Sequence, residues 1–187
     1  MVASSPNVRR REDVLGSRRI FDAVGAACIA LLVLGVPCAS GAATIRVPAD
    51  QPTIQHAIDA AVNGDLVIVS PGTYLEAVDF RGKIITVRSE QGPEATIIDA
   101  GGTGSVVKFK SGETRSAILS GFTIRGGQSL YYGAGIEVAF SSPTILGNII
   151  RDNRGCTGVG IHSYFGSPRI EGNSIVENAT DGCTGGW

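Results

Sequence analysis

Residues 133–153 read GAGIEVAFSSPTILGNIIRDN, and residues 158–178, which begin 25 positions later, read GVGIHSYFGSPRIEGNSIVEN. The two segments are identical at 11 of 21 positions. A unit this short cannot enclose a hydrophobic core alone, so it must stack on copies of itself. The identities include three columns of isoleucine, namely Ile136/Ile161, Ile145/Ile170 and Ile150/Ile175. We therefore expect a solenoid whose interior is lined by aliphatic columns.

Short apolar runs that end at Gly, Pro or Asn predict strands throughout the chain after residue 65, at 66–69, 77–80, 84–87, 95–98 and 106–109. The repeat starts before its clearest copy, because residues 119–125 align with residues 145–151. Three strands per period would pair in parallel with the next coil, and parallel crossovers are overwhelmingly right-handed. The predicted fold is an all-β solenoid, a right-handed parallel β-helix. A leucine-rich repeat would need more regularly spaced Leu, and a propeller blade about 40 residues.

Two pairs of asparagines, Asn148/Asn173 and Asn153/Asn178, fall at predicted turns of the repeat. Stacked side-chain amides can hydrogen-bond along a solenoid axis, so we expect two asparagine ladders. Only residues 51–64 have helical periodicity, with Ile54, Ala57, Ile58 and Ala61 on one face. This segment predicts an N-terminal capping α-helix that covers the first coil.

Residues 1–43 have the order of an export signal: arginines, an apolar run from Ala23 to Val36, then small residues. The apolar run of 14 residues is too short for a stable membrane span, which needs about 20. Arg18-Arg19 resembles a twin-arginine box, but Asp22 departs from that pattern, so the Sec and twin-arginine routes both stay open. We expect a bacterial protein that is secreted or placed in the cell envelope.

Residues 44–187 form the second predicted region, a β-helix domain that carries 11 Lys and Arg against 14 Asp and Glu. A mildly acidic domain without a basic cluster argues against nucleic acid as a partner. Cys156 and Cys183 occupy the same tetrapeptide, Gly-Cys-Thr-Gly, and should lie on neighbouring coils. The strand spacing of about 4.8 Å suits a disulfide, so we expect a bridge, with two stacked free thiols as the alternative.

The stretch IRVPADQPTIQHAIDAAVNGDLVIVSPGTYLEAVDF and the later GFTIRGG, GAGIEV and SSPTILGNIIRDN resemble the right-handed β-helix proteins of the pectin-lyase-like superfamily. The likeness covers nearly all of residues 45–187 and implies the same fold. Its enzymes act on polysaccharides through Asp, Arg and Gln motifs or through calcium-binding Asp clusters. Neither those motifs nor such clusters occur in this sequence, so no catalytic residue, metal site or cofactor is predicted.

The 25-residue offset places Glu137 beside His162 on one outward strand, and Ala139 beside Tyr164. A carboxylate, an imidazole and a phenol on neighbouring coils could bind sugar hydroxyls, so Glu137, His162 and Tyr164 are the candidate substrate-binding residues. Ordinary polar decoration of a wet strand face is the alternative. Asp152 and Glu177 also superpose, which places two carboxylates about 4.8 Å apart. They could attract a cation such as Ca²⁺, but two ligands make a poor calcium site, so we expect the nearby Arg151 and Arg154 to neutralise them.

Three functions remain open at this point. The chain could bind or present a surface to polysaccharide, it could belong to a carbohydrate-active lyase, hydrolase or esterase whose catalytic coils lie beyond Trp187, or it could be a structural envelope or adhesion protein. The last repeat breaks off at Gly185-Gly186-Trp187. We therefore expect a longer protein, or self-association at an open C-terminal coil.

Overall fold

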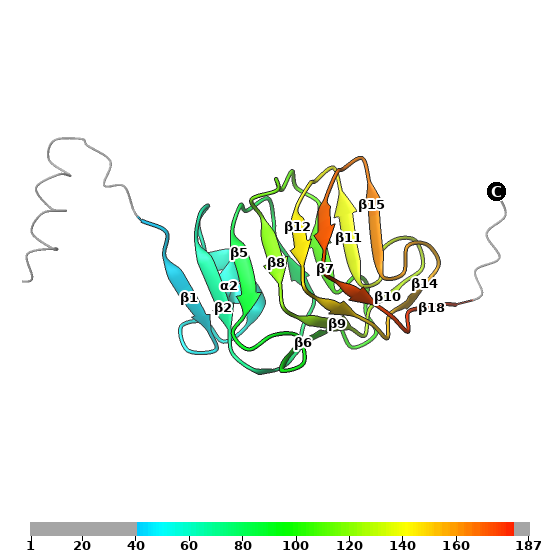
Figure 1. Ribbon diagram of the computed structural model, residues 1–187, viewed down its shortest axis with the longest axis horizontal. Coiled ribbons are helices and arrows are strands. Elements are labelled where there is room, and N and C mark those ends of the chain that lie inside the picture. The colour runs from blue at the N-terminus through cyan, green and yellow to red at the C-terminus, as the bar shows by residue number, and fades with distance from the viewer. Residues whose placement is uncertain (1–40, 182–187) are drawn as a thin grey trace, which may run out of the picture. The chain divides into compact units, whose positions relative to one another are not determined.

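The computed structural model describes residues 41–181, which form a parallel β-solenoid (Figure 1). The expected export signal lies outside the described residues, apart from its last three positions. In Figure 1, β1, β2, β5, β8 and β12 run side by side from left to right along the long axis. Successive strands in this row come from successive coils, and together they form one face of the solenoid.

The strands form four sheets, and every pairing between strands is parallel. The six-stranded sheet contains β1 (Thr44–Val47), β2 (Leu66–Val69), β5 (Thr86–Ser89), β8 (Ile118–Ser120), β12 (Thr144–Leu146) and β16 (Arg169–Glu171). The five-stranded sheet contains β3 (Gly72–Leu75), β6 (Thr96–Asp99), β9 (Thr123–Arg125), β13 (Ile149–Ile150) and β17 (Ser174–Ile175). The four-stranded sheet contains β4 (Val78–Asp79), β7 (Val107–Phe109), β11 (Ile136–Ala139) and β15 (Ile161–Tyr164). The three-stranded sheet contains β10 (Gln128–Ser129), β14 (Arg154–Gly155) and β18 (Ala179–Thr180).

The register follows the sequence repeat. Ile136 pairs with Ile161, Ile145 with Ile170, and Ile150 with Ile175, so the 25-residue offset is confirmed. Leu119 pairs with Ile145, which confirms the 26-residue offset before it. Ile136, Ile145 and Ile150 are fully buried, as inward-facing residues of a middle coil should be. They belong to one continuous core that also contains Phe80, Phe109 and Phe122.

Both predicted asparagine ladders are present. The Asn148 Oδ1 accepts the Phe122 N–H at 3.0 Å, and the Asn173 Oδ1 accepts the Asn148 N–H at 2.9 Å. The second ladder repeats this arrangement: the Asn153 Oδ1 accepts the Gly127 N–H, and the Asn178 Oδ1 accepts the Asn153 N–H. Each side chain therefore reaches back to the coil before it. This contact satisfies backbone donors at corners where the strand ladder is interrupted.

The helix α2 covers Ile54–Ala60, which is shorter than the predicted segment 51–64. It begins at Thr53, whose hydroxyl accepts the His56 N–H. Its apolar face packs into the core, where Ile54, Ala57 and Ile58 are fully buried. The handedness of the solenoid and the closure of its first coil by this helix stay predictions.

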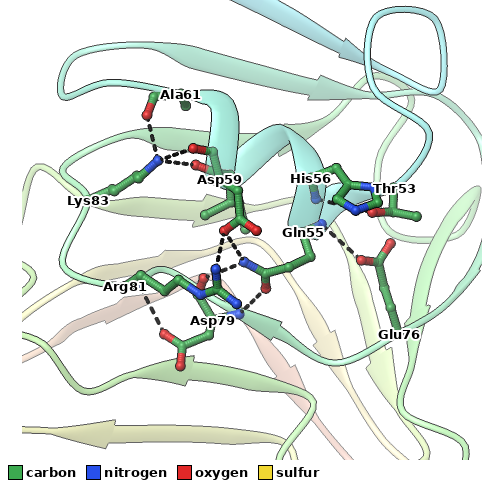
Figure 2. Close-up of polar contacts among 10 residues, drawn as sticks. Thr53, Gln55, His56, Asp59, Ala61, Glu76, Asp79, Arg81 and Lys83 are labelled. Carbon is green, nitrogen blue, oxygen red and sulfur yellow. Dashed lines mark hydrogen bonds and ion pairs between the residues drawn. The ribbon is translucent and has the colours of Figure 1, made fainter.

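Side chains from the next coil hold both ends of α2, as Figure 2 shows. The Glu76 carboxylate accepts the N–H groups of Ile54 and Gln55, each at 2.9 Å. The Lys83 ammonium donates to three carbonyls at the other end, those of Ile58, Asp59 and Ala61, at 2.6–2.7 Å. A carboxylate at the N-terminus and an ammonium at the C-terminus also interact favourably with the helix dipole. This polar cluster therefore attaches the helix to the solenoid.

Three features differ from the sequence predictions. The later coils have a fourth strand, because the two-residue strands β10, β14 and β18 form a sheet of their own. The strand β3 occupies Gly72–Leu75, a segment for which the sequence predicted no strand. The strand β1 lies outside the predicted strands as well. Two-residue strands and Gly-containing strands give no period-2 pattern, which is the signal that sequence analysis uses.

The corners of the repeat use left-handed backbone conformations at equivalent positions. The φ values of the pairs are 51° and 56° at Gly133/Gly158, 52° and 50° at Phe140/Phe165, 62° and 60° at Gly147/Gly172, and 54° and 55° at Asp152/Glu177. A bulky residue such as phenylalanine rarely adopts this conformation. Phe140 and Phe165 therefore occupy positions where the surrounding fold, rather than local preference, sets the backbone.

Candidate functional site

The outward face of the four-stranded sheet carries a row of ionisable residues, one from each coil. Asp79 pairs with Lys108, Lys108 with Glu137, and Glu137 with His162 in the strand register. The backbone thus brings together residues that are 83 positions apart in the sequence. Because neighbouring parallel strands lie about 4.8 Å apart, their outward side chains are within reach of a single ligand.

An open pocket of about 450 Å³ lies over this face. Strand β7 and the residue that follows it contribute Lys108 and Lys110, and β11 and β15 contribute Glu137 and Tyr164. The segment after β10 contributes Tyr131 and Tyr132. Gly104, Ser105 and Ser129 complete the lining. The pocket therefore combines aromatic rings, hydroxyls, one carboxylate and two ammonium groups.

Glu137 lies in the pocket wall but is not the solvated side chain that the sequence suggested. Its exposed fraction is 9%, its Oε1 lies 3.1 Å from the Lys110 Nζ, and its Oε2 accepts the Ser105 hydroxyl at 3.3 Å. A buried carboxylate needs such partners, since an unpaired one would be costly. Glu137 consequently serves to fix Lys110 and the wall of the pocket.

His162 packs against two tyrosines, Tyr132 and Tyr164, which also contact each other at a ring-centroid distance of 5.8 Å. Its ring centroid is 4.7 Å from that of Tyr132 and 5.8 Å from that of Tyr164. Its Nδ1 is buried and has no hydrogen-bond partner among residues 41–181. His162 does not line the pocket directly, whereas Tyr164 does. The structure therefore places the three sequence candidates side by side, with Tyr164 facing the pocket and His162 supporting Tyr132.

The aromatic contacts continue past Tyr164 onto an exposed pair of phenylalanines. Tyr164 meets Phe140 and Phe165 edge-on, at centroid distances of 5.3 and 5.5 Å. Phe140 and Phe165 stack with an interplanar angle of 6° and are 62% and 78% exposed. Exposed rings at left-handed positions have no role in the core. Phe140 and Phe165 directly follow β11 and β15, so they extend the aromatic surface past the ends of these strands. We call Tyr131, Tyr132, His162, Tyr164, Phe140 and Phe165 the aromatic strip.

Sequence reasoning missed the two lysines of the pocket and two of its three tyrosines, Tyr131 and Tyr132. Lys108 pairs with Glu137 across 29 residues, because the coil that contains β7 is longer than the 25-residue repeat. The repeat offset therefore could not align them. Tyr131 and Tyr132 lie between strands and have no repeat partner, so their only signal was two consecutive aromatic residues in a Gly-rich segment.

The remaining predicted pairs have simpler outcomes. Arg151 binds the Asp152 carboxylate at 2.8 Å, as expected, whereas Arg154 lies 3.7 Å from Asp181 instead. Cys156 is disulfide-bonded, but Cys183 lies outside the described residues, so their pairing stays a prediction. Within the described part of the chain, no group of three or more His, Cys, Asp or Glu could hold a metal ion.

The described residues of the site include no acid–base pair. Glu137 is held by Lys110 and Ser105, and no hydrogen bond joins it to His162 in the part of the chain that is described. Lys108 forms no ion pair with any described residue, which leaves a positive charge available to a ligand. None of the described helices is long and apolar enough to cross a membrane. The chain matches no family model, no curated protein and no solved structure.

Proposed function

We propose that this chain is an exported β-solenoid protein that binds polysaccharide on the outer face of β4, β7, β11 and β15. The observation that carries the proposal is the aromatic strip beside the pocket that contains Lys108. Pyranose rings have apolar C–H faces, and these stack on aromatic rings whose faces carry negative charge density. Tyrosine also offers a hydroxyl at its polar end, which suits the rim of a sugar.

The charge of the pocket favours a glycan that carries carboxylate or sulfate groups. Lys108 and Lys110 supply two positive charges against the single negative charge of Glu137. This local excess lies on a domain whose net charge is negative, so it is a property of the site and not of the whole surface. An ammonium that has no protein partner loses less on binding an anion than one that must first leave a salt bridge.

The resemblance to the pectin-lyase-like superfamily supports the same proposal, since its members act on such polymers. The predicted export signal supports it too, because extracellular polysaccharide is reached only after export. Binding, and not turnover, is proposed because the pocket lacks an acid–base pair among the described residues. The alternative is a structural envelope or adhesion protein that binds no polysaccharide.

Binding of the full chain to a glycan array, followed by titration with the polymers that bind, tests the proposal. We expect Tyr132→Ala and Lys108→Ala each to weaken binding at least about tenfold, which corresponds to about 1.4 kcal/mol. The effect of Lys108→Ala should disappear with neutral polymers. Leu75→Ala and Arg88→Ala are matched controls, because both residues are exposed on other sheets.

Two results would contradict the proposal: no binding to any glycan, or equal binding by the wild type and the pocket variants. Release of soluble products from pectin or alginate by the same chain would instead show an enzyme. A spacer protein would fold normally and bind nothing on the array.

A further inference from the structure

The aromatic strip lies across the solenoid and not along its axis. His162 and Tyr164 are outward residues of β15, and Phe165 directly follows that strand. Because a strand rises by about 3.3 Å per residue, these three positions span roughly 10 Å in the strand direction. In Figure 1 the arrows of β11 and β15 stand across the long axis, along which the coils stack. A ligand that follows the strip therefore runs transverse to the solenoid axis.

The strip offers three aromatic platforms in sequence. The ring centroid of Tyr132 lies 5.8 Å from that of Tyr164, and the Tyr164 centroid lies 5.3 and 5.5 Å from those of Phe140 and Phe165. Phe140 and Phe165 stack on each other and form the third platform. A pyranose has a six-membered ring of similar size, so neighbouring sugars of an extended glycan can lie over neighbouring platforms. The strip has room for about three sugars on this basis.

Positive charge is available at one end of the strip. Lys108, which forms no ion pair with any described residue, pairs in register with Glu137, and Glu137 pairs with His162. Lys108 thus lies level with the His162 end of the strip. At the other end, residues 138–143 and 163–168, which contain both phenylalanines, include no charged side chain. An anionic sugar is therefore stabilised at the first end, and the sugars that follow it face uncharged rings.

The path along the solenoid axis is less favourable for an acidic chain. Asp79 pairs with Lys108 on the preceding coil, so the two backbones lie about 4.8 Å apart. The Asp79 Oδ1 accepts the Arg81 N–H at 2.9 Å, but the Arg81 guanidinium binds Asp59 instead (Figure 2). A second anionic group one step along the axis from Lys108 would meet the Asp79 carboxylate, and like charges repel.

We propose that this face binds an acidic oligosaccharide segment of about three sugars that crosses the solenoid. Its charged sugar lies beside Lys108, an uncharged sugar lies over Tyr164, and a third sugar lies over the phenylalanine pair. The inference rests on the proposed function and adds the direction of the ligand, its length and the position of its charge. A glycan in which acidic and neutral sugars alternate fits this arrangement. A charge on every sugar fits less well, because a carboxylate over Tyr164 would face the negative charge density of the ring.

Calorimetric titration of the full chain with two series of fragments, from disaccharide to octasaccharide, tests the inference. Hyaluronan fragments carry a carboxylate on every second sugar, and oligogalacturonides carry one on every sugar. We expect the affinity for hyaluronan fragments to rise up to the tri- or tetrasaccharide and then to gain only the statistical factor of additional binding registers. Oligogalacturonides of equal length should bind at least about fivefold more weakly.

Two variants distinguish the transverse path from the axial one. Phe165→Ala should weaken binding of the tetrasaccharide at least about fivefold and leave the disaccharide unaffected, because only the longer fragment reaches the third platform. Asp79→Asn removes the charge that an axial ligand would meet but keeps an acceptor for the Arg81 N–H, so binding should change less than about twofold. Leu75→Ala, at an exposed position on β3, is the control for Phe165→Ala.

Several outcomes would overturn the inference. An affinity that keeps rising with length beyond the register factor, or tighter binding by Asp79→Asn, would show a ligand that follows the axis. Equal binding of the two series would refute the position of the charge, and an unchanged Phe165→Ala would refute the third platform. If neither series binds while polymers on the glycan array do, this inference fails and the proposed function stands. If nothing binds in either experiment, both fail.

Discussion

Replacement of Asn148 by leucine tests whether the asparagine ladder supports the core of the solenoid. Asn148 is almost completely buried, and its side chain has two backbone partners in the preceding coil. Its Oδ1 accepts the Phe122 N–H at 3.0 Å, and its Nδ2 donates to the Leu119 carbonyl at 3.2 Å. Leucine has a similar volume but no polar atoms, so the Phe122 N–H would stay buried without its acceptor, while the Leu119 carbonyl would lose one donor but keep its place in the β8–β12 ladder.

Each buried group left unpaired costs about 1–3 kcal/mol, and the added apolar burial of leucine offsets part of that. We therefore expect Asn148→Leu to lower the free energy of unfolding by about 2 kcal/mol. Asn173→Leu is the matched control, because it makes the same change one coil later. Water reaches that coil and replaces the lost hydrogen bonds, so about 1 kcal/mol is expected there.

Equilibrium unfolding in urea, followed by circular dichroism, gives both values by linear extrapolation. Hydrogen exchange gives a local reading, since the Phe122 amide should exchange much faster in Asn148→Leu and unchanged in Asn173→Leu. The reasoning is refuted if the two variants are equally stable, or if the Phe122 amide stays protected in Asn148→Leu. Either result would mean that the corner donors find other acceptors.

Three further predictions concern other parts of the fold. Lys83→Met removes three hydrogen bonds to the end of α2 and should cost about 1–2 kcal/mol in urea unfolding, because the ammonium is only partly buried; an unchanged midpoint would contradict this. Hydrogen bonds from the Val62 and Ala43 N–H groups lower the pKa of Asp65 in the folded protein below its ordinary value of 3.8. The ionised Asp65 carboxylate therefore stabilises the fold above pH 3.8, and this stabilisation is lost as the pH falls through the lowered pKa of the folded state. A stability profile against pH should therefore be flatter at the acid end for Asp65→Asn, and an identical slope would count against the assignment. Gly127→Ala should be strongly destabilising in the same urea assay, because a Cβ at this position would overlap the Ala134 carbonyl. Gly92→Ala is the control: its Cβ would meet no atom, so the fold should be retained at the smaller cost of placing alanine in a left-handed conformation.

The sequence was most informative where the chain repeats with constant spacing. Identical residues at an offset of 25 gave the register of β11 with β15, the aliphatic columns and the ladder partners, because a solenoid places equivalent positions next to one another. The coils before residue 118 vary in length. Val67 pairs with Val87 across 20 residues, and Val87 pairs with Leu119 across 32. No single offset could align those coils.

The candidate site was only partly predictable for the same reason. Tyr164 and Glu137 lie in the regular coils and were found by the repeat. Lys108 lies one irregular coil earlier, and Tyr132 lies in a segment between strands, so their approach to the pocket depends on the path of the chain in space. The burial of Glu137 was missed because it depends on Lys110 and Ser105, which also precede the regular repeat.

The recurrence of left-handed corners also bears on how such a chain could lengthen. Both 25-residue units have four left-handed residues at the same positions and with nearly the same φ angles, so a duplicated unit would contain the residues that form its own corners. An inserted copy needs no adjustment of its neighbours, because each junction repeats one that already exists. Gene duplication can thus extend the molecule in steps of one coil, and residues 133–157 and 158–181 look like two such steps preserved side by side.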